Sequence, residues 1–264
     1  MRVGIDKIRV YPTSMALSME RLCQARNHDL ADIHDVMMID ERSVNPPWED
    51  PVTMAVNAAL PLLDEEDRAR IELLLVCSES GVDQEKPMST WVQRYLGLSS
   101  RTRNLEVKHA CYSGTGALQL ASAYIASGVC SPKARALVIT TDQSRMHLGK
   151  PYEFVMGAGA TAMVISAEPR LFELELGKSG VHTHEVSDLT RPTSRVETGN
   201  SETSLISYLE GLEGALAAYL ERVGEPVGYD YFARNIYHVP FGGMTLRASR
   251  AALRQFGSFS RAEA

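Results

Sequence analysis

Three residues of the kinds that carry covalent chemistry stand at or near apolar runs of this 264-residue sequence. Glu79 follows the apolar run Leu73–Cys77, Cys111 lies in the stretch HACYSGTGALQLA, and His238 lies between apolar neighbours in NIYHVPFGG. A sulfur nucleophile, a carboxylate that moves a proton and an imidazole that polarises a substrate form a catalytic set. The question is whether the chain brings them together.

Cys111 has two interpretations. A nucleophilic cysteine needs a lowered pKa and an open approach, and the N–H groups and dipole of a helix N-terminus favour the thiolate. Cys111 precedes a helix that we expect to begin near Gly114 or Thr115, where Gly114 and Gly116 add little bulk. Its own N–H can also serve as an oxyanion donor. Because cysteines are commonly buried, this stretch alone is equally consistent with a core cysteine.

The other two residues favour the catalytic interpretation. A carboxylate directly after an apolar strand, as at Glu79, has no packing role. A lone histidine in an apolar strand is more often a hydrogen-bonded core residue, so His238 alone decides nothing. Strand ends can converge at one edge of a sheet, however, and that edge is where α/β proteins form their sites. We therefore expect Glu79, Cys111 and His238 to meet at one sheet edge.

Apolar runs that are typical of buried strands alternate with helical patterns. The runs cover Leu73–Ser80, Ala136–Ser144, Ala160–Ala167 and Asn235–Phe241. Apolar residues from Ala117 onward follow one helix face, and leucines spaced by three or four predict a second helix near Ser204–Val223 that ends at Gly224. This alternation predicts an α/β fold with a buried sheet.

Three further segments have structural interpretations. Residues Asp64–Arg70 are expected to be a solvated helix end, and His182–Asn200 a long polar loop. The stretch from Gly157 to Ala162 matches the glycine pattern of dinucleotide-binding loops, but a strand-like run follows where such a loop needs a helix. We therefore assign Gly157 and Gly159 to tight backbone packing.

Composition narrows the class of protein. The net charge of −6 argues against nucleic-acid binding. No apolar run approaches the roughly 20 residues of a membrane span, and the N-terminus lacks the apolar core of a signal peptide. The cysteines are scattered without a CxxC pair, which favours reduced thiols in the cytoplasm over disulfides or a metal site. These cysteines are Cys23, Cys77, Cys111 and Cys130.

Four segments, in order, resemble the 3-hydroxy-3-methylglutaryl (HMG) synthase family of the thiolase superfamily. They are CSESGVD (77–83), ACYSGTGALQLA (110–121), GAGATAMVIS (157–166) and YHVPFGGM (237–244). Residues 46–61 and 191–212 resemble the branch of polyketide gene clusters that installs β-methyl groups on carrier-protein-bound chains. The resemblance implies a thiolase-like layered α/β fold with mixed five-stranded sheets. Residues 1–167 would form the N-terminal half and 168–264 a partial C-terminal half.

The C-terminal half is expected to be incomplete. Members of the family extend well beyond the position of residue 264, and their late glycine- and serine-rich loop has no match here. Whether the 264-residue chain is active alone is therefore open at this point.

The resemblance also implies a mechanism. Cys111 accepts an acetyl group from a donor thioester. Glu79 removes a proton from the acetyl methyl, the enolate attacks the β-ketone of an acceptor, and His238 hydrogen-bonds the acceptor carbonyl. Ser204 matches a serine that the family places near the substrate, and Asp142 and Asp188 match acidic positions with supporting roles in substrate binding. Water then releases an HMG-type thioester.

The resemblance implies acyl carrier proteins as donor and acceptor partners, with the phosphopantetheine arm supplied by the carrier protein and no separate cofactor or metal. A homodimer is implied too. Relatives that use coenzyme A have a lysine soon after the histidine, whereas here no cation separates His238 from Arg247. Arg94, Arg101 and Arg103 are candidates for a basic carrier-protein patch.

Three alternatives remain open on the sequence alone. The first is an HMG-CoA synthase that uses coenzyme A thioesters. The second is a condensing enzyme of the fatty-acid type, which usually carries a second histidine or asparagine motif that is not seen here. The third is an inactive, truncated scaffold that only docks carrier proteins.

Overall fold

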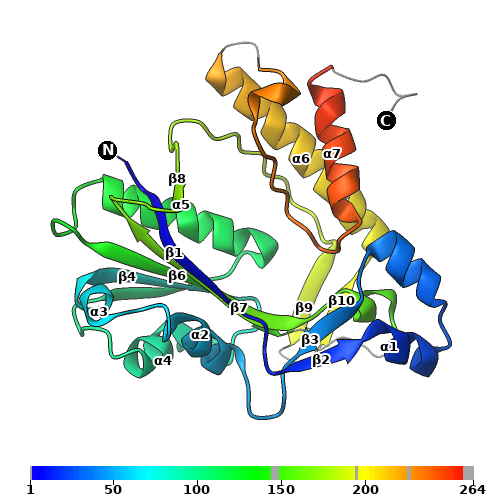
Figure 1. Cartoon of the computed structure of the whole chain (residues 1–264), viewed down its shortest axis with the longest axis horizontal. Helices are drawn as coiled ribbons and strands as arrows, with labels where there is room; N and C mark the ends of the chain where they lie inside the picture. The colour runs from blue at the N-terminus through cyan, green and yellow to red at the C-terminus, as the bar shows by residue number, and fades with distance from the viewer. Residues whose placement is uncertain (1, 144–148, 194–195, 225–226, 258–264) are drawn as a thin grey trace. The chain divides into compact units, whose positions relative to one another are not determined.

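The computed structural model of the chain describes residues 2–143, 149–193, 196–224 and 227–257 (Figure 1). The chain forms two compact units. Residues 1–17, 43–144 and 157–176 form the first unit, and residues 18–42, 145–156 and 177–264 form the second. No helix within the described ranges is long and apolar enough to cross a membrane.

The first unit is built on a mixed sheet with the strand order β5-β4-β6-β7-β1-β8. The strands are β1 (Gly4–Tyr11), β4 (Ile71–Cys77), β5 (Arg103–Val107), β6 (Arg135–Gln143), β7 (Ala158–Ser166) and β8 (Phe172–Glu173). Strand β4 runs parallel to β5 and β6, while β6–β7, β7–β1 and β1–β8 pair antiparallel. The predicted mixed five-stranded sheet is confirmed, and the two-residue strand β8 adds a short sixth member.

Helices cover both faces of this sheet (Figure 1). Helix α5 (Ser113–Ala126) lies on one face, and α2 (Pro51–Ala59), α3 (Glu65–Arg70) and α4 (Met88–Tyr95) lie on the other. Along β4, Leu73, Leu75 and Cys77 pack in the cluster that includes α5, whereas Leu74 and Val76 pack in the cluster that includes α2 and α4. Burial on both faces explains why β4 is a continuous apolar run in the sequence.

The glycines of the first unit serve packing. The predicted strands from Leu73, Ala136 and Ala160 are confirmed as β4, β6 and β7, and β7 begins inside the stretch that matched a dinucleotide loop. A Cβ on Gly159 would lie 3.0 Å from the Tyr11 carbonyl oxygen. This close approach of two backbones is the role that we assigned to the glycine.

The charged segment before β4 differs from its prediction at one residue. Asp64 caps α3 as expected of a helix start, since its side chain accepts the Asp67 N–H. Asp67, however, is completely buried, accepts a hydrogen bond from Lys7 Nζ at 2.6 Å and is paired with Arg135. The prediction of a solvated helix end is therefore wrong for Asp67, because two cations from distant strands neutralise it inside the unit.

The second unit is mainly helical. Its elements are α1 (Met19–Arg26), the π-helix η1 (Asp32–Met37), the 3₁₀-helices η3 (Pro151–Phe154) and η4 (Tyr229–Tyr231), β9 (Leu189–Thr193), β10 (Val196–Gly199), α6 (Ser201–Val223) and α7 (Met244–Gln255). The chain passes between the units through β2 (Met15–Ser18) and β3 (Glu41–Val44), which form a two-stranded sheet.

The predicted leucine-rich helix is confirmed as α6. It begins three residues earlier than expected because Asn200 caps it, accepting the N–H groups of Glu202 and Thr203. It ends as predicted at Gly224, whose φ of 69° is the left-handed conformation that favours glycine.

Two predictions for this unit are wrong. The segment expected as a long loop, 182–200, contains β9 and β10, which pair antiparallel and are also joined by an ion pair between Arg191 and the buried Glu197. The apolar run Asn235–Phe241 is not a strand, and no strand of the described residues pairs with it. A strand needs a neighbour for its backbone groups; here the His238 carbonyl accepts a side-chain hydroxyl, that of Tyr208.

Candidate active site

Three strands of the first unit end together. In the parallel register, Cys77 of β4 stands opposite Val107 of β5 and Thr140 of β6. The carboxyl ends of these strands therefore lie along one edge of the sheet. Glu79 follows the end of β4 by two residues, and Cys111 follows the end of β5 by four. Asp142 is the second-last residue of β6. Two of the three predicted catalytic residues and one predicted supporting residue thus share a sheet edge.

The Asp142 carboxylate holds the segment that carries Glu79. Its Oδ1 accepts hydrogen bonds from Ser78 Oγ at 3.0 Å, from the Glu79 N–H at 3.0 Å and from Ser80 Oγ at 2.6 Å. Ser80 Oγ in turn accepts the Gln143 N–H at 3.1 Å. The backbone of half-buried Glu79 is therefore fixed just beyond the strand, which gives Asp142 a geometric role in positioning the carboxylate.

Cys111 lies next to the N-terminal end of a helix. It is the middle residue of the 3₁₀-helix η2 (Ala110–Tyr112), which leads directly into α5 at Ser113. The residue is exposed, so the alternative of a core cysteine is wrong. The preceding Ala110 has a φ of 40°, an uncommon conformation for a residue with a side chain, and such strain concentrates at functional sites.

The two glycines after Cys111 allow close packing at this helix start. A Cβ on Gly114 would lie 2.7 Å from Cγ2 of Thr140, so glycine lets the first turn of α5 approach β6. A Cβ on Gly116 would lie 3.0 Å from the Tyr112 ring. The positive end of the α5 dipole is thereby held next to Cys111, where it favours a thiolate.

Two other cysteines are unsuited to nucleophilic attack. Cys23 and Cys77 are both 1% exposed. Burial, with a smaller contribution from Asp142, raises the pKa of Cys77 to about 12. The Cys77 thiol therefore stays protonated at neutral pH, although Cys77 is only two residues before Glu79.

His238 belongs to the second unit. It lies in the irregular segment between α6 and α7, where its ring stacks on that of Tyr208 at 6.0 Å between centroids and 28° between planes. The Tyr208 hydroxyl donates to the His238 carbonyl oxygen at 2.9 Å. One side of His238 is open to solvent, yet desolvation by the packed side lowers its pKa. At neutral pH the imidazole is therefore uncharged, with one N–H donor and one acceptor nitrogen.

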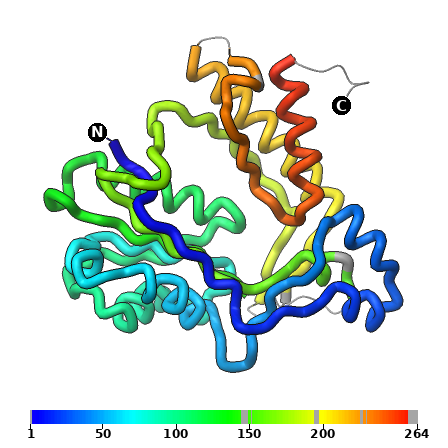
Figure 2. Tube along the Cα trace, in the orientation of Figure 1, coloured from blue at the N-terminus to red at the C-terminus, as the bar shows by residue number. Residues whose placement is uncertain are grey.

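The glycines after His238 fasten its segment to the π-helix η1. The Gly243 N–H donates to the Met37 carbonyl oxygen at 3.2 Å, and a Cβ on Gly243 would overlap the Val36 carbonyl oxygen. A Cβ on Gly242 would lie 2.9 Å from the Met38 carbonyl oxygen. The orange segment before α7 can be followed along α6 in Figure 2. Glycine is required here by the approach of another backbone.

The remaining predicted substrate residues also belong to the second unit. Ser204 lies in the first turn of α6, four residues before Tyr208, and so on the same side of the helix. The Asp188 carbonyl accepts the N–H of Asn200 at 2.8 Å, which joins the start of β9 to the cap of α6.

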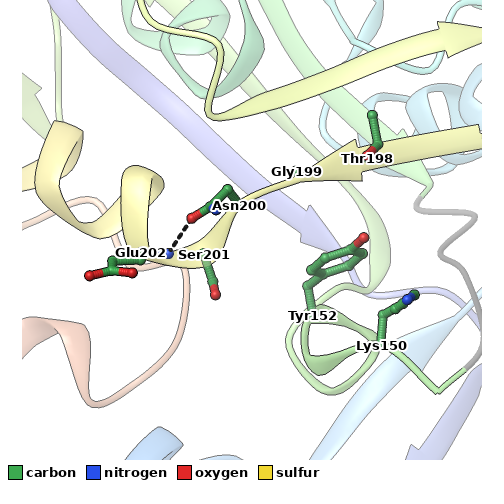
Figure 3. Close-up of a pocket in the computed structure, with 7 residues that line it drawn as sticks. All are labelled: Lys150, Tyr152, Thr198, Gly199, Asn200, Ser201 and Glu202. Atoms are coloured by element: carbon green, nitrogen blue, oxygen red, sulfur yellow. Dashed lines mark hydrogen bonds between the residues drawn. The ribbon is translucent and has the colours of Figure 1, made fainter.

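An open pocket of about 620 Å³ lies at the start of α6 (Figure 3). It is lined by Lys150, Tyr152, Thr198, Gly199, Asn200, Ser201 and Glu202. Neither Ser204 nor Asp188 lines it. Lys150 and Tyr152 had no signal in the sequence, and the other lining residues lie in the segments 182–200 and 191–212. Its lysine, tyrosine and hydroxyl groups suit a polar ligand.

The predicted set is therefore divided between the units. Glu79, Cys111 and Asp142 lie in the first, whereas His238, Ser204 and Asp188 lie in the second. The meeting of His238 with Glu79 and Cys111 stays a prediction. Within the ranges that the structure describes, no group of three His, Cys, Asp or Glu side chains is arranged to hold a metal ion.

The proposed basic patch does not frame the Cys111 edge. Arg94, Arg101 and Arg103 are exposed, but Arg101 and Arg103 lie at the amino end of β5, and Cys111 follows its carboxyl end. Arg103 Nη1 also donates to the Tyr124 hydroxyl at 2.9 Å. The three arginines are thus a weaker candidate for carrier-protein docking than the sequence indicated.

Sequence reasoning missed the residues that position the predicted ones. Tyr208 had a signal, its spacing of four from Ser204, and Ser78 and Ser80 flank Glu79 directly. Their partners Asp142 and His238 are distant in the sequence, so the contacts themselves were not visible.

Known proteins similar to this chain are HMG synthases. No protein-family model matches the chain. The polyketide biosynthesis 3-hydroxy-3-methylglutaryl-ACP synthase PksG of Bacillus subtilis is 39% identical over 96% of this chain and 63% of its own length. A hydroxymethylglutaryl-CoA synthase of Enterococcus faecalis is 31% identical over 96% of this chain and 65% of its own length.

Solved structures of HMG synthases are also similar to this chain. The HMG synthase of the curacin biosynthetic pathway, crystallised with apo donor-ACP, has a TM-score of 0.92 and 43% identity, covering 100% of this chain and 64% of that one. MvaS in complex with 3-hydroxy-3-methylglutaryl coenzyme A has a TM-score of 0.93 and 32% identity, covering 98% of this chain and 65% of that one. The chain therefore spans just under two thirds of the length of these relatives, and over that span it has the thiolase-like fold and the sequence motifs of the HMG synthases.

Proposed function

We propose that the protein is an HMG-synthase-like acyltransferase of polyketide biosynthesis. It condenses acetyl from a donor acyl carrier protein with a β-ketoacyl carrier-protein thioester, the carbon–carbon bond-forming step of β-methyl branching. The observation that carries the proposal is the sheet edge at which exposed Cys111, at the start of α5, accompanies Glu79 on a segment held by Asp142. The identity to PksG and to the curacin synthase supports the polyketide assignment.

Cys111 performs the first half-reaction. Its thiolate attacks the acetyl carbonyl carbon, and the donor phosphopantetheine thiolate leaves and takes up a proton. The helix start next to Cys111 stabilises the thiolate before attack, and backbone N–H groups there stabilise the oxyanion that forms during it. The product is an acetyl thioester on Cys111.

Glu79 performs the second half-reaction. Its carboxylate removes a proton from the acetyl methyl, and the enolate carbon attacks the β-ketone carbon of the acceptor. The protonated Glu79 then returns its proton to the new alkoxide. His238, uncharged at neutral pH, donates its N–H to the acceptor carbonyl oxygen, and Ser204, Asp188 and Asp142 support substrate binding. Water cleaves the Cys111 thioester and releases the HMG-type product.

Carrier proteins are the proposed source of both acyl groups. No cation lies between His238 and Arg247, so the nucleotide phosphates of coenzyme A would lack a partner there. A charge-assisted contact is worth about 1.5–3 kcal/mol, which is about ten- to a hundredfold in affinity. A phosphopantetheine arm on a carrier protein has no nucleotide and needs no such contact.

A comparison of two donors tests this function. Acetyl carrier protein and acetyl-CoA, at equal concentration, are mixed with the protein, and acetyl on Cys111 is measured by mass spectrometry over time. We expect faster acetylation by the carrier protein.

The other outcomes of this comparison correspond to other functions. Faster acetylation by acetyl-CoA would instead assign the chain to the hydroxymethylglutaryl-CoA synthases, such as its relative from E. faecalis. Acetylation by neither donor would indicate a docking scaffold without activity.

We also propose that the protein is a homodimer formed through β5. This strand is the outer strand of its sheet, none of the described strands pairs with its outer side, and Leu105 on it is 57% exposed. An uncovered strand edge offers backbone donors and acceptors to a second copy, and a two-fold arrangement would use the same edge of both.

Two further parts of the proposal concern domains and location. Residues 1–167 and 168–264 would form the two domain halves. The scattered cysteines favour a cytoplasmic location.

Size-exclusion chromatography with light scattering tests the dimer. We expect the wild-type mass to be that of two chains and Leu105→Lys to shift it toward one, because a charge would be buried at the new interface. Leu171→Lys is the matched control: Leu171 is 51% exposed, but it lies beside β8 at the opposite edge. A single-chain mass for the wild type would refute the dimer.

A further inference from the structure

We propose that Tyr208 is a positioning residue that holds His238 in the orientation in which it serves the acceptor. The inference rests on the proposed function, since it assigns a support to the residue that would polarise the acceptor carbonyl. It is carried by two separate contacts between Tyr208 and His238, one to the backbone and one to the ring.

The first contact fixes the backbone of His238. Its segment has no regular secondary structure, so no strand ladder holds it in place. The hydrogen bond from the Tyr208 hydroxyl to the His238 carbonyl oxygen, 2.9 Å long, takes the place of a ladder bond. Pro240, two residues later, favours an extended conformation at Val239 and thereby adds stiffness to the same stretch.

The second contact fixes the plane of the imidazole. The Tyr208 and His238 rings are nearly parallel, with 28° between their planes and 6.0 Å between their centroids. A ring that faces another ring cannot turn freely about its Cβ–Cγ bond, so the direction of the His238 N–H is restricted. A side chain that donates a hydrogen bond to a reacting carbonyl must have a fixed orientation, because small errors of orientation reduce the rate strongly.

Both contacts come from one residue of a long, capped helix. Tyr208 is half-buried in the second turn of the 23-residue helix α6, one turn after Ser204. The far end of the His238 segment is fastened independently, by the Gly243 N–H on the Met37 carbonyl oxygen. The segment is therefore held at two points, at His238 by Tyr208 and at Gly243 by Met37, and of these two contacts only that of Tyr208 involves the imidazole.

Two substitutions separate the contacts. Tyr208→Phe removes the hydroxyl but keeps the stacked ring, whereas Tyr208→Leu removes both. The control is Tyr219→Phe, which removes a hydroxyl from the same helix eleven residues later, where the ring faces Phe232 instead. Acetylation of Cys111 by acetyl carrier protein and condensation with acetoacetyl carrier protein are measured separately, with unfolding temperatures for all variants.

The expected result is a split between the two half-reactions. Tyr208→Phe should acetylate Cys111 at the wild-type rate but lower kcat/KM for the acceptor by about three- to tenfold, the value of one lost hydrogen bond. Tyr208→Leu should lower it further, and the Tyr219→Phe control should lower neither rate. A purely structural role would reduce both half-reactions together or shift only the unfolding temperature, and would overturn the proposal.

The same data distinguish a failure of the proposed function. If the wild type neither acetylates Cys111 nor condenses, the function is refuted before any variant is compared, and the role of Tyr208 toward an acceptor falls with it. If the wild type is active and both Tyr208 variants keep its acceptor kinetics, the function stands and the positioning role alone is refuted.

Discussion

Cys111→Ser removes all thioester-linked acetyl from the protein. The reason is the chemistry of the acyl-enzyme. A serine hydroxyl stays protonated at neutral pH and is therefore a weak nucleophile, and any acyl group that it accepted would be held as an ester, not as a thioester. The helix start next to residue 111 lowers the energy of a thiolate but does not supply the general base that a serine nucleophile needs. The measurement is peptide mass spectrometry after incubation with acetyl carrier protein.

Cys130→Ser is the matched control for this variant. Cys130 is half-buried and lies after the far end of α5, so its replacement should leave acetylation unchanged. Buried Cys23 and Cys77 are not expected to react. Labelling of any of these three cysteines in the Cys111→Ser protein would show that the nucleophile has been misassigned.

Glu79→Gln acetylates Cys111 but does not condense. The amide keeps the size of the side chain and leaves the backbone hydrogen bond to Asp142 intact, so the segment keeps its position. It cannot accept the methyl proton, and loss of a general base costs of order 10²-fold or more in rate. We therefore expect normal formation of the acetyl-enzyme and a condensation rate that is lower by at least that factor.

Hydrogen exchange isolates the step that needs Glu79. In heavy water, the acetyl group on Cys111 of the wild type should take up deuterium through the enolate, and in Glu79→Gln it should not. Glu85→Gln is the control, because Glu85 is an exposed residue of the same loop. Wild-type condensation by Glu79→Gln would remove the carboxylate from the mechanism.

The elements that sequence analysis predicted are those whose signals are local. Strand β4 is buried on both faces and so reads as an unbroken apolar run, and α6 shows its leucine spacing and its terminal Gly224 directly. The place of Cys111 before a helix was predictable for the same reason, since glycines and a helical pattern follow it within a few residues.

The features that were missed depend on contacts between distant segments. Asp67 is buried only because Lys7 and Arg135 neutralise it, and nothing near Asp67 in the sequence indicates this. The stretch around His238 has the composition of a strand, but composition does not say whether a neighbouring strand exists. The site shows the same limit: the places of Glu79 after a strand and of Cys111 before a helix were predictable, whereas the contact between Tyr208 and His238 was not.

The hydrogen bond from Gly243 to Met37 has a consequence for how the protein matures during synthesis. It joins residues about 200 positions apart, whereas the contacts of Ser80 with Asp142 and Gln143 span about 60. Contacts of long sequence separation form late, because the intervening chain must be closed into a loop first. During synthesis, the first unit, which contains Glu79 and Cys111, can therefore fold before Gly243 has been made and the His238 segment can be fastened to η1.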